Sequence, residues 1–408
     1  MPLRVLQIIS SVAEVNGGAS TAMWSTLKAL RSRNVQCDLV TTNEDGPNRL
    51  MDVPLGEFVN EAGHRVRYFP ARGDRYTTSW PLARWLFAHA RDYDVLHVHG
   101  LFRFAPVAAA YAALAKAVPY VLTLHNVLGQ WGMQNRRPLL KRLSIGLIEG
   151  RIIDGARCVH LCSPEELAQV LKVRELGTRS RVFPLGVDLL PDDLGLPPDI
   201  RVAARLKRLA GRTVVLYMSR IHEIKGVDRL LQAFVAVRRA LPDAVLAIAG
   251  SGDATLVSSL RAQAARLGIA DSTEWLGFVH GQQKHELLSL ARVFVLPSHS
   301  ENFGYAVVEA LQAGLPVVTT SNVPAGAFVR QADAGLIYDG SIEQLEASIL
   351  QVLRMPEEVR QALGARGAVE VRERLSLGKY GESLEGAYRD ALSAGLGPRA
   401  ALQSRQAQ

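Results

Sequence analysis

Short apolar runs alternate with longer segments of helical periodicity along most of the chain. The runs are rich in β-branched residues and Leu, which is typical of strands buried on both faces of a parallel sheet. The segments between them repeat apolar residues every three or four positions, which predicts covering helices. The expected strands are 5–9, 36–42, 65–69, 95–99, 120–125, 158–163, 181–184, 214–219, 245–249, 274–278, 293–297 and 316–320. The pattern predicts an α/β chain with doubly wound sheets.

A stretch rich in Pro and Gly, from Leu189 to Pro198, interrupts this series and has the composition of a linker. A length of 408 residues agrees with two domains, at roughly 100 to 200 residues each. We expect an N-terminal domain at 1–188, a linker at 189–211, a C-terminal domain at 212–375, a helical segment at 376–396 that returns to the first domain, and a flexible tail at 397–408.

Composition places the chain among globular proteins, with 48% apolar and 21% charged residues. Three cysteines cannot form a disulfide framework and do not supply the ligand pairs of a structural zinc site, so a reducing cytoplasm is expected. The longest apolar stretch, 105–124, is broken by Lys116 and two prolines. No secretory signal or transmembrane helix is therefore predicted.

The net charge of +8 is unevenly distributed. Residues 1–190 hold 23 Lys and Arg against 16 Asp and Glu, whereas residues 191–408 hold 24 against 23. This asymmetry predicts an anionic partner for the first domain, either a phosphorylated acceptor or a membrane surface. Nucleic acid is not expected as a partner, because no dense basic stretch is interleaved with aromatic residues.

The segment 134–157 combines several Lys and Arg residues with many Leu and Ile residues. This mixture fits an amphipathic helix in peripheral contact with an anionic membrane. The same leucines and isoleucines also fit the buried stripe of a packed helix, because both have the same periodicity.

Candidate chemistry follows the strands, since open α/β sheets bind ligands beyond the carboxyl ends of their strands. Gly17 and Gly18 follow the first strand and could admit an anion to a helix N-terminus, or could form an ordinary tight turn. The dinucleotide fingerprint G-x-G-x-x-G is absent there, and Gly250-Ser251-Gly252 is followed by Thr255 where its third glycine would stand. A nicotinamide or flavin enzyme is therefore disfavoured.

Arg220 and Lys225 lie where the first strand of the second series gives way to a helix. Two cations and helix N–H groups could bind a diphosphate there, and the alternative is a solvated basic loop. Glu301 and Glu309 are eight positions apart, which is about 12 Å along one helix axis if the helix covers both. That spacing exceeds the ~5 to 9.5 Å of glycoside hydrolases and suits two contacts with an extended ligand.

The chain resembles a retaining glycosyltransferase of family 4. The resemblance rests on a combination of motifs that covers nearly the whole length: Gly17-Gly18, Asp94 to Gly100, Leu124-His125-Asn126, Arg220 with Lys225-Gly226, Ala249 to Gly252, and Glu301 with Glu309. It implies the GT-B fold, in which two Rossmann-like domains with doubly wound parallel sheets face each other across a deep interdomain cleft. The run 220–226 together with 300–304 is similar to bacterial transferases that assemble exopolysaccharides and other surface glycans.

The resemblance also implies roles for individual residues. Arg220 and Lys225 hold the donor diphosphate, Glu301 binds the transferred hexose, and His125 lies beside that sugar, which makes these four the expected catalytic residues. The expected donor-binding residues are Gly17, Gly18, Gly250, the backbone of Phe303, Gly304 and Tyr305, and Glu309 for the ribose hydroxyls. The run 185–188 has Leu185 where the family often has Asn, and no catalytic role is expected there.

No metal and no other cofactor are expected. Asp92 and Asp94 match the D-x-D metal motif of another glycosyltransferase fold, but they precede a strand and so lie away from the ligand side. His97 and His99 share one strand face without a third ligand.

The expected function is hexose transfer from a UDP- or GDP-sugar to a hydroxyl of a glycan or lipid-linked acceptor in bacterial polysaccharide biosynthesis. The expected location is the cytoplasm, including the inner face of the plasma membrane. The alternatives are a GT-B phosphorylase or epimerase, and an inactive sugar-nucleotide-binding module. A phosphorylase would need a lysine for pyridoxal phosphate, which we do not identify, and an inactive module should have lost Arg220, Lys225 or Glu301.

Overall fold

The computed structural model describes residues 2–393 except Glu14, Asn16, Pro47, Arg75, Arg136 and 189–198. The core of the expected linker and the expected tail at 397–408 lie outside these residues. The described chain forms two compact units. Unit 1 comprises the N-terminal part to Gly186 and the segment from Leu377, and unit 2 comprises Val187–Ser376.

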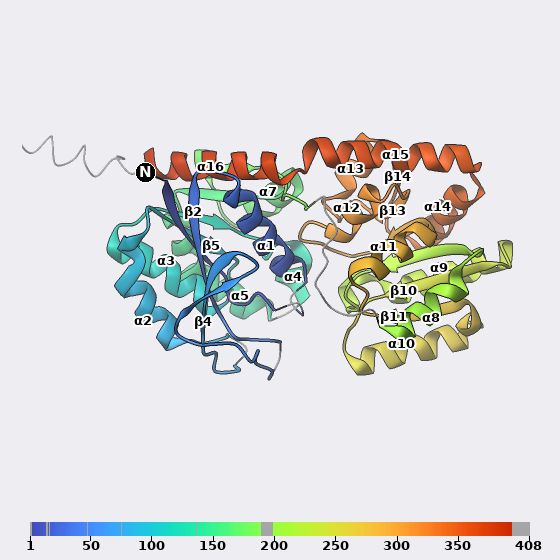
Figure 1. Cartoon of the computed structure of the whole chain (residues 1–408), viewed down its shortest axis with the longest axis horizontal. Coiled ribbons are helices and arrows are strands. Elements are labelled where there is room, and N and C mark those ends of the chain that lie inside the picture. The colour runs from blue at the N-terminus through green and yellow to red at the C-terminus, as the bar shows by residue number, and fades with distance from the viewer. Residues whose placement is uncertain are drawn as a thin grey trace, which may run out of the picture. The chain divides into compact units, whose positions relative to one another are not determined.

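Unit 1 is built on an eight-stranded sheet with the order β3-β4-β2-β1-β5-β6-β7-β8 (Figure 1). All neighbouring strands are parallel except β3 and β4. Its strands are β1 (Leu3–Ile8), β2 (Val35–Thr42), β3 (Phe58–Glu61), β4 (His64–Phe69), β5 (Val95–His99), β6 (Tyr120–Thr123), β7 (Cys158–Leu161) and β8 (Ser180–Val182). β1 and β5 are the central pair, and all residues of β5, β6 and β7 are buried.

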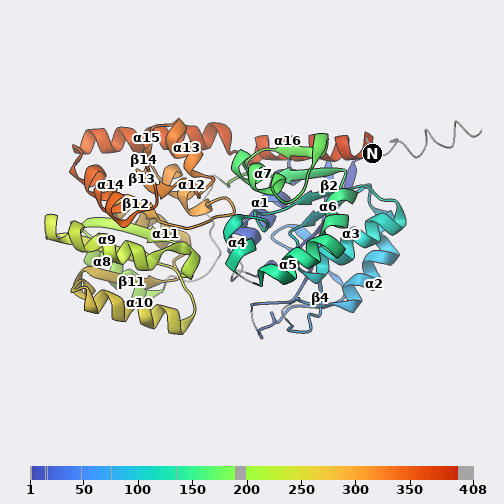
Figure 2. The same ribbon diagram turned by 180° about the vertical axis from the view of Figure 1, so that it is seen from behind.

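Helices flank this sheet (Figure 2). They are α1 (Gly18–Arg31), α2 (Trp80–His89), α3 (Phe104–Lys116), α4 (Gln130–Asn135), α5 (Pro138–Ser144), α6 (Gly150–Gly155), α7 (Pro164–Leu171) and α16 (Leu377–Ser393). Short turns are η2 (Ala90–Asp92), the π-helical η3 (Ile145–Glu149) and η4 (Gly177–Arg179). The C-terminal helix α16 packs on α1 and against β6 and β7, so the end of the described chain belongs to the first unit.

Unit 2 has a six-stranded, fully parallel sheet with the order β11-β10-β9-β12-β13-β14. Its strands are β9 (Thr213–Met218), β10 (Ala244–Ala249), β11 (Thr273–Gly277), β12 (Ala291–Leu296), β13 (Val317–Thr320) and β14 (Gly335–Tyr338). This is the Rossmann order 3-2-1-4-5-6, in which the order of successive strands reverses between β9 and β12. The expected doubly wound parallel sheets are thus present in both units.

The helices of unit 2 cover this sheet (Figure 1). They are α8 (Ile200–Leu209), α9 (Val227–Ala240), α10 (Ala254–Arg266), α11 (Gly281–Leu290), α12 (Tyr305–Gln312), α13 (Gly326–Gln331), α14 (Ile342–Arg354) and α15 (Glu357–Arg374), with short turns η5 (Glu223–Lys225) and η6 (Ala270–Ser272). Helix α8 occupies part of the range expected to be a linker. It packs on α11 and β11, with Val202, Leu206 and Leu209 buried.

Candidate functional site

Two loops of unit 2 leave the sheet at the point where its strand order reverses. The loop after β9 runs to α9, and the loop after β12 runs to α12. Since β9 and β12 are hydrogen-bonded neighbours, their carboxyl ends lie side by side. This is the position at which open α/β sheets bind ligands, and it holds four of the residues expected from the sequence: Arg220, Lys225, Glu301 and Phe303.

Gly226 brings the two loops into direct contact. Its φ of 69° lies in the left-handed region, and a Cβ atom there would be 2.4 Å from the carbonyl oxygen of Pro297. Any other residue would therefore push the loops apart. The backbone N–H of His299 donates to the carbonyl of Ile224 over 2.8 Å and holds the loops at this separation.

This contact places Lys225 beside Glu301. The Nζ atom of Lys225 is 2.5 Å from Oε1 of Glu301, and the Ser298 hydroxyl donates to the same oxygen over 2.8 Å. The Lys225 and Glu301 side chains are only 12% and 9% exposed. A cation and an anion are thus held close together, largely out of water, at the carboxyl ends of the two central strands.

Arg220 lies in the loop between β9 and η5 and is exposed. Its carbonyl accepts a hydrogen bond from the Tyr217 hydroxyl over 3.0 Å. Gly250 lies in the next loop and has φ 147°, and a Cβ atom there would be 1.9 Å from the Ser219 carbonyl oxygen. The glycine therefore allows the loop after β10 to pack on the loop after β9, and its expected contact with the donor stays a prediction.

Phe303, Gly304 and Tyr305 lead into α12, which begins at Tyr305. The Phe303 side chain is 1% exposed and its ring contacts Tyr305 and Phe328, so only its backbone could line a ligand. The Phe303 carbonyl accepts from the N–H of Ala325 over 2.8 Å. Because α12 does not include Glu301, the axial separation expected for a single helix covering both glutamates does not apply.

Glu309 lies on α12 and forms an ion pair with a lysine that sequence reasoning missed. Nζ of Lys284, on α11, is 3.0 Å from Oε1 of Glu309, and the two side chains are 18% and 27% exposed. Ser298, which orients Glu301, was missed as well. Neither residue belongs to a local motif, although the position of Ser298 directly after a strand was a usable signal.

The expected site residues of unit 1 lie at the carboxyl ends of β1 and β6. Gly17, with φ 59°, directly precedes Gly18 at the start of α1. The strand expected at 120–125 ends earlier, at Thr123, because His125 and Asn126 both have left-handed backbones with φ near 55°. Such a conformation is rare outside glycine, and it turns this segment out of the sheet.

The side chain of His125 contacts a second histidine. Its Nε2 is 3.0 Å from Nδ1 of His99, and the two rings are stacked. Desolvation, followed by the influence of His160, lowers the pKa of His125 to about 3. At neutral pH the imidazole is therefore uncharged.

The two aspartates of the D-x-D pattern lie before β5, at the amino ends of the strands, whereas the expected site residues lie at the carboxyl ends. Asp92 ends η2 and contacts Nδ1 of His89 at 2.9 Å, and Asp94 accepts from the backbone N–H of Arg4 over 2.8 Å. Across the described residues, no group of three or more His, Cys, Asp or Glu side chains is placed to hold a metal ion.

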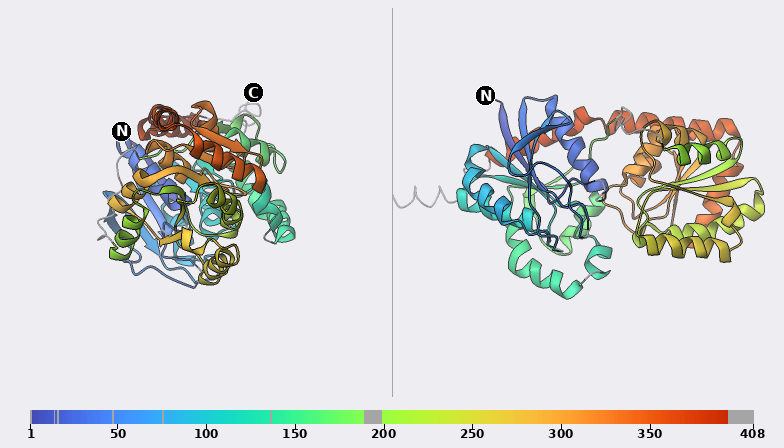
Figure 3. Two further views of the ribbon diagram at one scale, coloured as in Figure 1. Left: turned by 90° about the vertical axis from the view of Figure 1, so that its right-hand side faces the viewer. Right: turned by 60° about the horizontal axis from the view of Figure 1, so that its bottom comes forward.

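The basic segment that the sequence singled out forms one continuous helical stretch from α5 through η3 to α6, and it projects from the body of unit 1 (Figure 3). One face is buried, with Ile145, Ile152 and Ile153 in the core. The other face exposes four leucines: Leu139 is 77% exposed, Leu140 56%, Leu143 58% and Leu147 58%. Arg137, Arg142 and Arg151 are exposed on the same stretch, and Arg136 lies outside the described residues. The stretch therefore has both a buried stripe and an apolar, basic surface.

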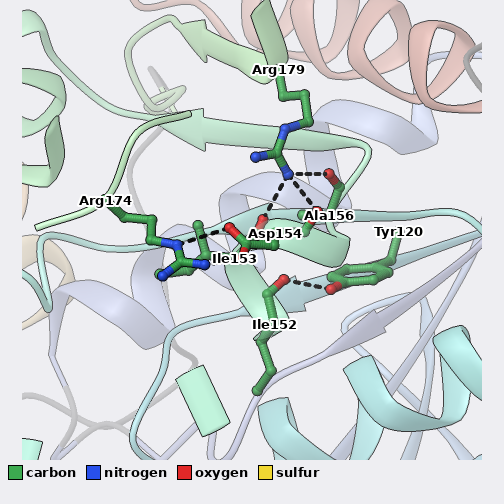
Figure 4. A network of polar contacts seen from close by, with 7 residues as sticks. All are labelled: Tyr120, Ile152, Ile153, Asp154, Ala156, Arg174 and Arg179. Atoms are coloured by element: carbon green, nitrogen blue, oxygen red, sulfur yellow. Dashed lines mark hydrogen bonds and ion pairs between the residues drawn. The ribbon is translucent and has the colours of Figure 1, made fainter. Parts of the chain in front are cut away.

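A network of polar contacts fastens the C-terminal end of this stretch (Figure 4). The Arg179 guanidinium donates to the carbonyl oxygens of Ile153, Asp154 and Ala156 at 3.1, 2.6 and 3.3 Å. Arg174 binds the Asp154 carboxylate, and the Tyr120 hydroxyl donates to the Ile152 carbonyl. Terminal carbonyls of a helix are usually satisfied in this way, so the base of the stretch is held rigidly. No helix of the described chain is long and apolar enough to cross a bilayer.

Comparisons with known proteins agree with this architecture. The family model described as glycosyl transferase 4-like domain matches residues 17–186, and that described as glycosyl transferases group 1 matches residues 203–369. A phosphatidyl-myo-inositol mannosyltransferase of Mycobacterium leprae is 27% identical over 91% of this chain and 92% of its own. A D-inositol 3-phosphate glycosyltransferase of Acidothermus cellulolyticus is 30% identical over 74% of this chain and 68% of its own.

The fold is shared with solved structures. One is the Anabaena protein HepE, crystallised in complex with UDP and glucose. It is 18% identical, with a TM-score of 0.73 over 94% of this chain and 98% of its own. The α/β class inferred from the sequence is thus confirmed.

Proposed function

Because the chain belongs to the family 4 glycosyltransferases of the GT-B fold, we propose that it transfers a hexose from UDP- or GDP-hexose to a hydroxyl of a lipid-linked glycan acceptor. We further propose that the anomeric configuration is retained, that no divalent cation is required, and that the acceptor belongs to a bacterial polysaccharide. A phosphorylase, an epimerase or an inactive binding module remain the competing assignments.

The ion pair of Lys225 and Glu301 is the observation that carries the proposal. Loss of a nucleoside diphosphate leaves negative charge on the departing phosphates, and a positioned cation stabilises that charge most effectively where water is scarce. Lys225, helped by Arg220, supplies this charge in place of a metal. The Glu301 carboxylate accepts hydrogen bonds from hydroxyls of the transferred sugar, and Ser298 holds it in place.

Retention follows from attack on the same face that the diphosphate leaves. The departing phosphate oxygen helps to take the proton of the acceptor hydroxyl, so no enzymatic nucleophile is needed. An inactive module would have no need to keep Lys225 and Glu301 together out of water, since burial of an ion pair costs desolvation energy. The pair therefore favours an active transferase over an inactive module.

Glu309 is assigned to the ribose of the donor, and Glu309→Gln should weaken binding of the free nucleoside diphosphate about fivefold to 150-fold. The reason is that a charged acceptor of ribose hydrogen bonds becomes a neutral amide. Calorimetric titration with UDP and GDP measures the loss directly.

Lys284→Met is the matched control, because it breaks the same ion pair and leaves the Glu309 carboxylate in place. It should weaken binding less than Glu309→Gln does. Equal losses would mean that the ion pair, and not a contact with ribose, accounts for the effect.

The acceptor is assigned to unit 1, whose charge is strongly positive. Counted by unit, the sequence gives 27 Lys and Arg against 18 Asp and Glu in unit 1, and 20 against 21 in unit 2. Both curated relatives named above act on acceptors that carry an inositol phosphate. We propose that the acceptor here is also anionic and that a lipid holds it at the membrane surface.

The exposed leucines of the α5 stretch are proposed to contact that membrane. Leu139, Leu143 and Leu147 repeat every four positions, which places them on one side of the helical stretch. Arg137 and Arg142 are exposed on the same stretch, and their guanidinium groups are assigned to lipid phosphates. An amphipathic helix of this kind binds at the interface through apolar burial and attraction to anionic lipid.

Liposome cosedimentation tests this assignment. Binding should rise with the fraction of anionic lipid and fall with salt, because each engaged basic residue contributes ~1 kcal/mol and is screened by ions. The variant with Arg137, Lys141, Arg142 and Arg151 all changed to Gln should lose most of the binding, and so should Leu139→Ser with Leu143→Ser.

The control removes the same charge elsewhere in unit 1, by changing Arg72, Arg84, Arg91 and Lys172 to Gln, which are all exposed. That variant should bind liposomes almost as well as the wild type. Equal losses in both charge variants would assign the attraction to net charge alone, and no binding by the wild type at low salt would refute the membrane contact.

A further inference from the structure

A continuous chain of hydrogen bonds crosses the buried sheet of unit 1 and ends at His125. It joins side chains of four neighbouring strands and of α16. The first contacts join the Phe183 carbonyl to His160 Nε2 (2.9 Å), His160 Nδ1 to Thr123 Oγ1 (3.0 Å), and Thr123 Oγ1 to His97 Nε2 (2.7 Å). The chain continues from His97 Nδ1 to the Tyr388 hydroxyl (2.8 Å) and from that hydroxyl to Gln7 Nε2 (3.0 Å). It then runs from Gln7 Oε1 to His99 Nε2 (2.9 Å) and ends with His99 Nδ1 and His125 Nε2 (3.0 Å). We call this chain the histidine relay.

The far end of the relay has only one proton arrangement. A backbone carbonyl can only accept, so Nε2 of His160 carries the proton and its Nδ1 accepts. The single hydroxyl proton of Thr123 must then be donated to His160. Thr123 Oγ1 consequently accepts from Nε2–H of His97, and Nδ1 of His97 is left as an acceptor.

The same logic passes through α16. The Tyr388 hydroxyl has one proton, and it must be donated to Nδ1 of His97. Its oxygen therefore accepts from the amide of Gln7, which fixes the orientation of that amide. The Sγ atom of Cys37, 3.9 Å from Gln7 Nε2, lies within reach as a weak acceptor, in agreement with this orientation.

The near end of the relay is His125. With the Gln7 amide oriented in this way, its Oε1 accepts from Nε2–H of His99, and Nδ1 of His99 accepts. His125 must then donate its own Nε2–H to His99, so the lone pair of His125 is on Nδ1. Burial lowers the pKa of all four histidines, so each carries one ring proton at neutral pH, as the argument requires.

We propose that Gln7 and Tyr388 are positioning residues that hold His125 in its Nε2–H tautomer, with Nδ1 as the acceptor for a hydroxyl of the transferred sugar or of the acceptor. The contact with substrate rests on the proposed function and on the place beside the sugar that the family resemblance implies for His125, whereas the tautomer itself follows from the relay alone. The C-terminal helix then contributes to the site through Tyr388, which lies 291 positions from its partner His97.

The proton positions are measured by nitrogen NMR of protein labelled with ¹⁵N at histidine, with the His125 signals assigned from their loss in His125→Ala. The two ring nitrogens of a neutral imidazole differ clearly in shift according to which carries the proton. In the wild type, the protonated nitrogen of His125 should be Nε2. A proton on Nδ1, or a mixture of both tautomers, would overturn the proposal.

Tyr388→Phe removes the link between His97 and Gln7, and it should turn His125 into a mixture of tautomers. Tyr380→Phe is the matched control, because Tyr380 lies on the same helix and is also buried, and the hydroxyl that the variant removes contacts Thr26 at 3.0 Å outside the relay. The ring of Tyr380, which contacts His160, is kept. It should leave the His125 tautomer unchanged. Thr123→Val breaks the relay from the other side and serves if Tyr388→Phe does not fold.

Three results distinguish the relay from a general loss of packing and from a failure of the proposed function. An unchanged His125 tautomer in both Tyr388→Phe and Thr123→Val would overturn the relay. If Tyr380→Phe altered the tautomer as Tyr388→Phe did, general loss of packing would explain both changes. Transfer should fall about threefold to tenfold in Tyr388→Phe and not in Tyr380→Phe. A fixed tautomer in a protein that transfers no sugar would refute the proposed function and leave the relay intact.

Discussion

Replacement of Lys225 by Ala is expected to lower turnover by about two to three orders of magnitude. This corresponds to ~3 to 4 kcal/mol of transition-state stabilisation, the loss typical of removing one preorganised charge from a site with little water. The side chain is 12% exposed and contacts Glu301, so its charge is poorly screened by solvent. The measurement is the initial rate of hexose transfer at saturating donor.

The variant also leaves the Glu301 carboxylate without its cation, so its thermal unfolding must be compared with that of the wild type. Arg208→Ala is the control for loss of a cation from unit 2. Arg208 pairs with Glu274 near the start of β11, at the amino ends of the strands. Its replacement by Ala should therefore leave turnover unchanged. A folded Lys225→Ala protein with the turnover of the wild type would remove the role of Lys225 toward the leaving group.

Glu301→Gln is expected to lower transfer about tenfold to hundredfold, with much less effect on binding of the free nucleoside diphosphate. The amide keeps the shape of the side chain but accepts hydrogen bonds from sugar hydroxyls less strongly than a carboxylate does. Transfer rates and titration with the nucleoside diphosphate, which lacks the sugar, separate the two effects.

Two further variants sharpen the test of Glu301. Ser298→Ala removes the hydroxyl that orients the carboxylate, and it should give a smaller loss of the same kind. The double variant Lys225→Ala with Glu301→Gln should show losses that are not the sum of those of the two single variants, because the two residues contact each other. If Glu301→Gln weakened binding of the free diphosphate as much as it slowed transfer, the carboxylate would not be assigned to the sugar.

The sequence predicted the two sheets because most of their strands are apolar runs buried on both faces. Two strands were missed for physical reasons. β3 is a four-residue edge strand with Asn and Glu, and β14 is a four-residue edge strand that begins at a glycine, so neither shows a clear period. The first helix of unit 2, α8, follows the proline-rich stretch directly, and its ten residues are too few to stand out from a linker.

The site was only partly predictable. Lys225 and Glu301 were singled out separately, but their contact depends on the close approach that Gly226 allows between the loop after β9 and Pro297. The role of Lys284 could not be predicted from the sequence, because its partner Glu309 lies on another helix. The relay through Tyr388 depends on the packing of α16 against the sheet of unit 1, and no local pattern in the sequence encodes such a contact.

Thermal unfolding in the presence of UDP-, GDP- and dTDP-hexoses tests the central claim, that unit 2 binds a nucleoside diphosphate sugar through Lys225, Glu301 and Glu309. A ligand present at a hundredfold its Kd adds about 2.7 kcal/mol to the stability of the fold that binds it, which corresponds to a rise in midpoint of about 5 to 10 °C for a unit of this size. We expect at least one UDP- or GDP-hexose to give such a rise in the wild type and a much smaller one in Lys225→Ala and Glu309→Gln. No rise with any of the sugars, or the same rise in the wild type and both variants, would contradict the claim.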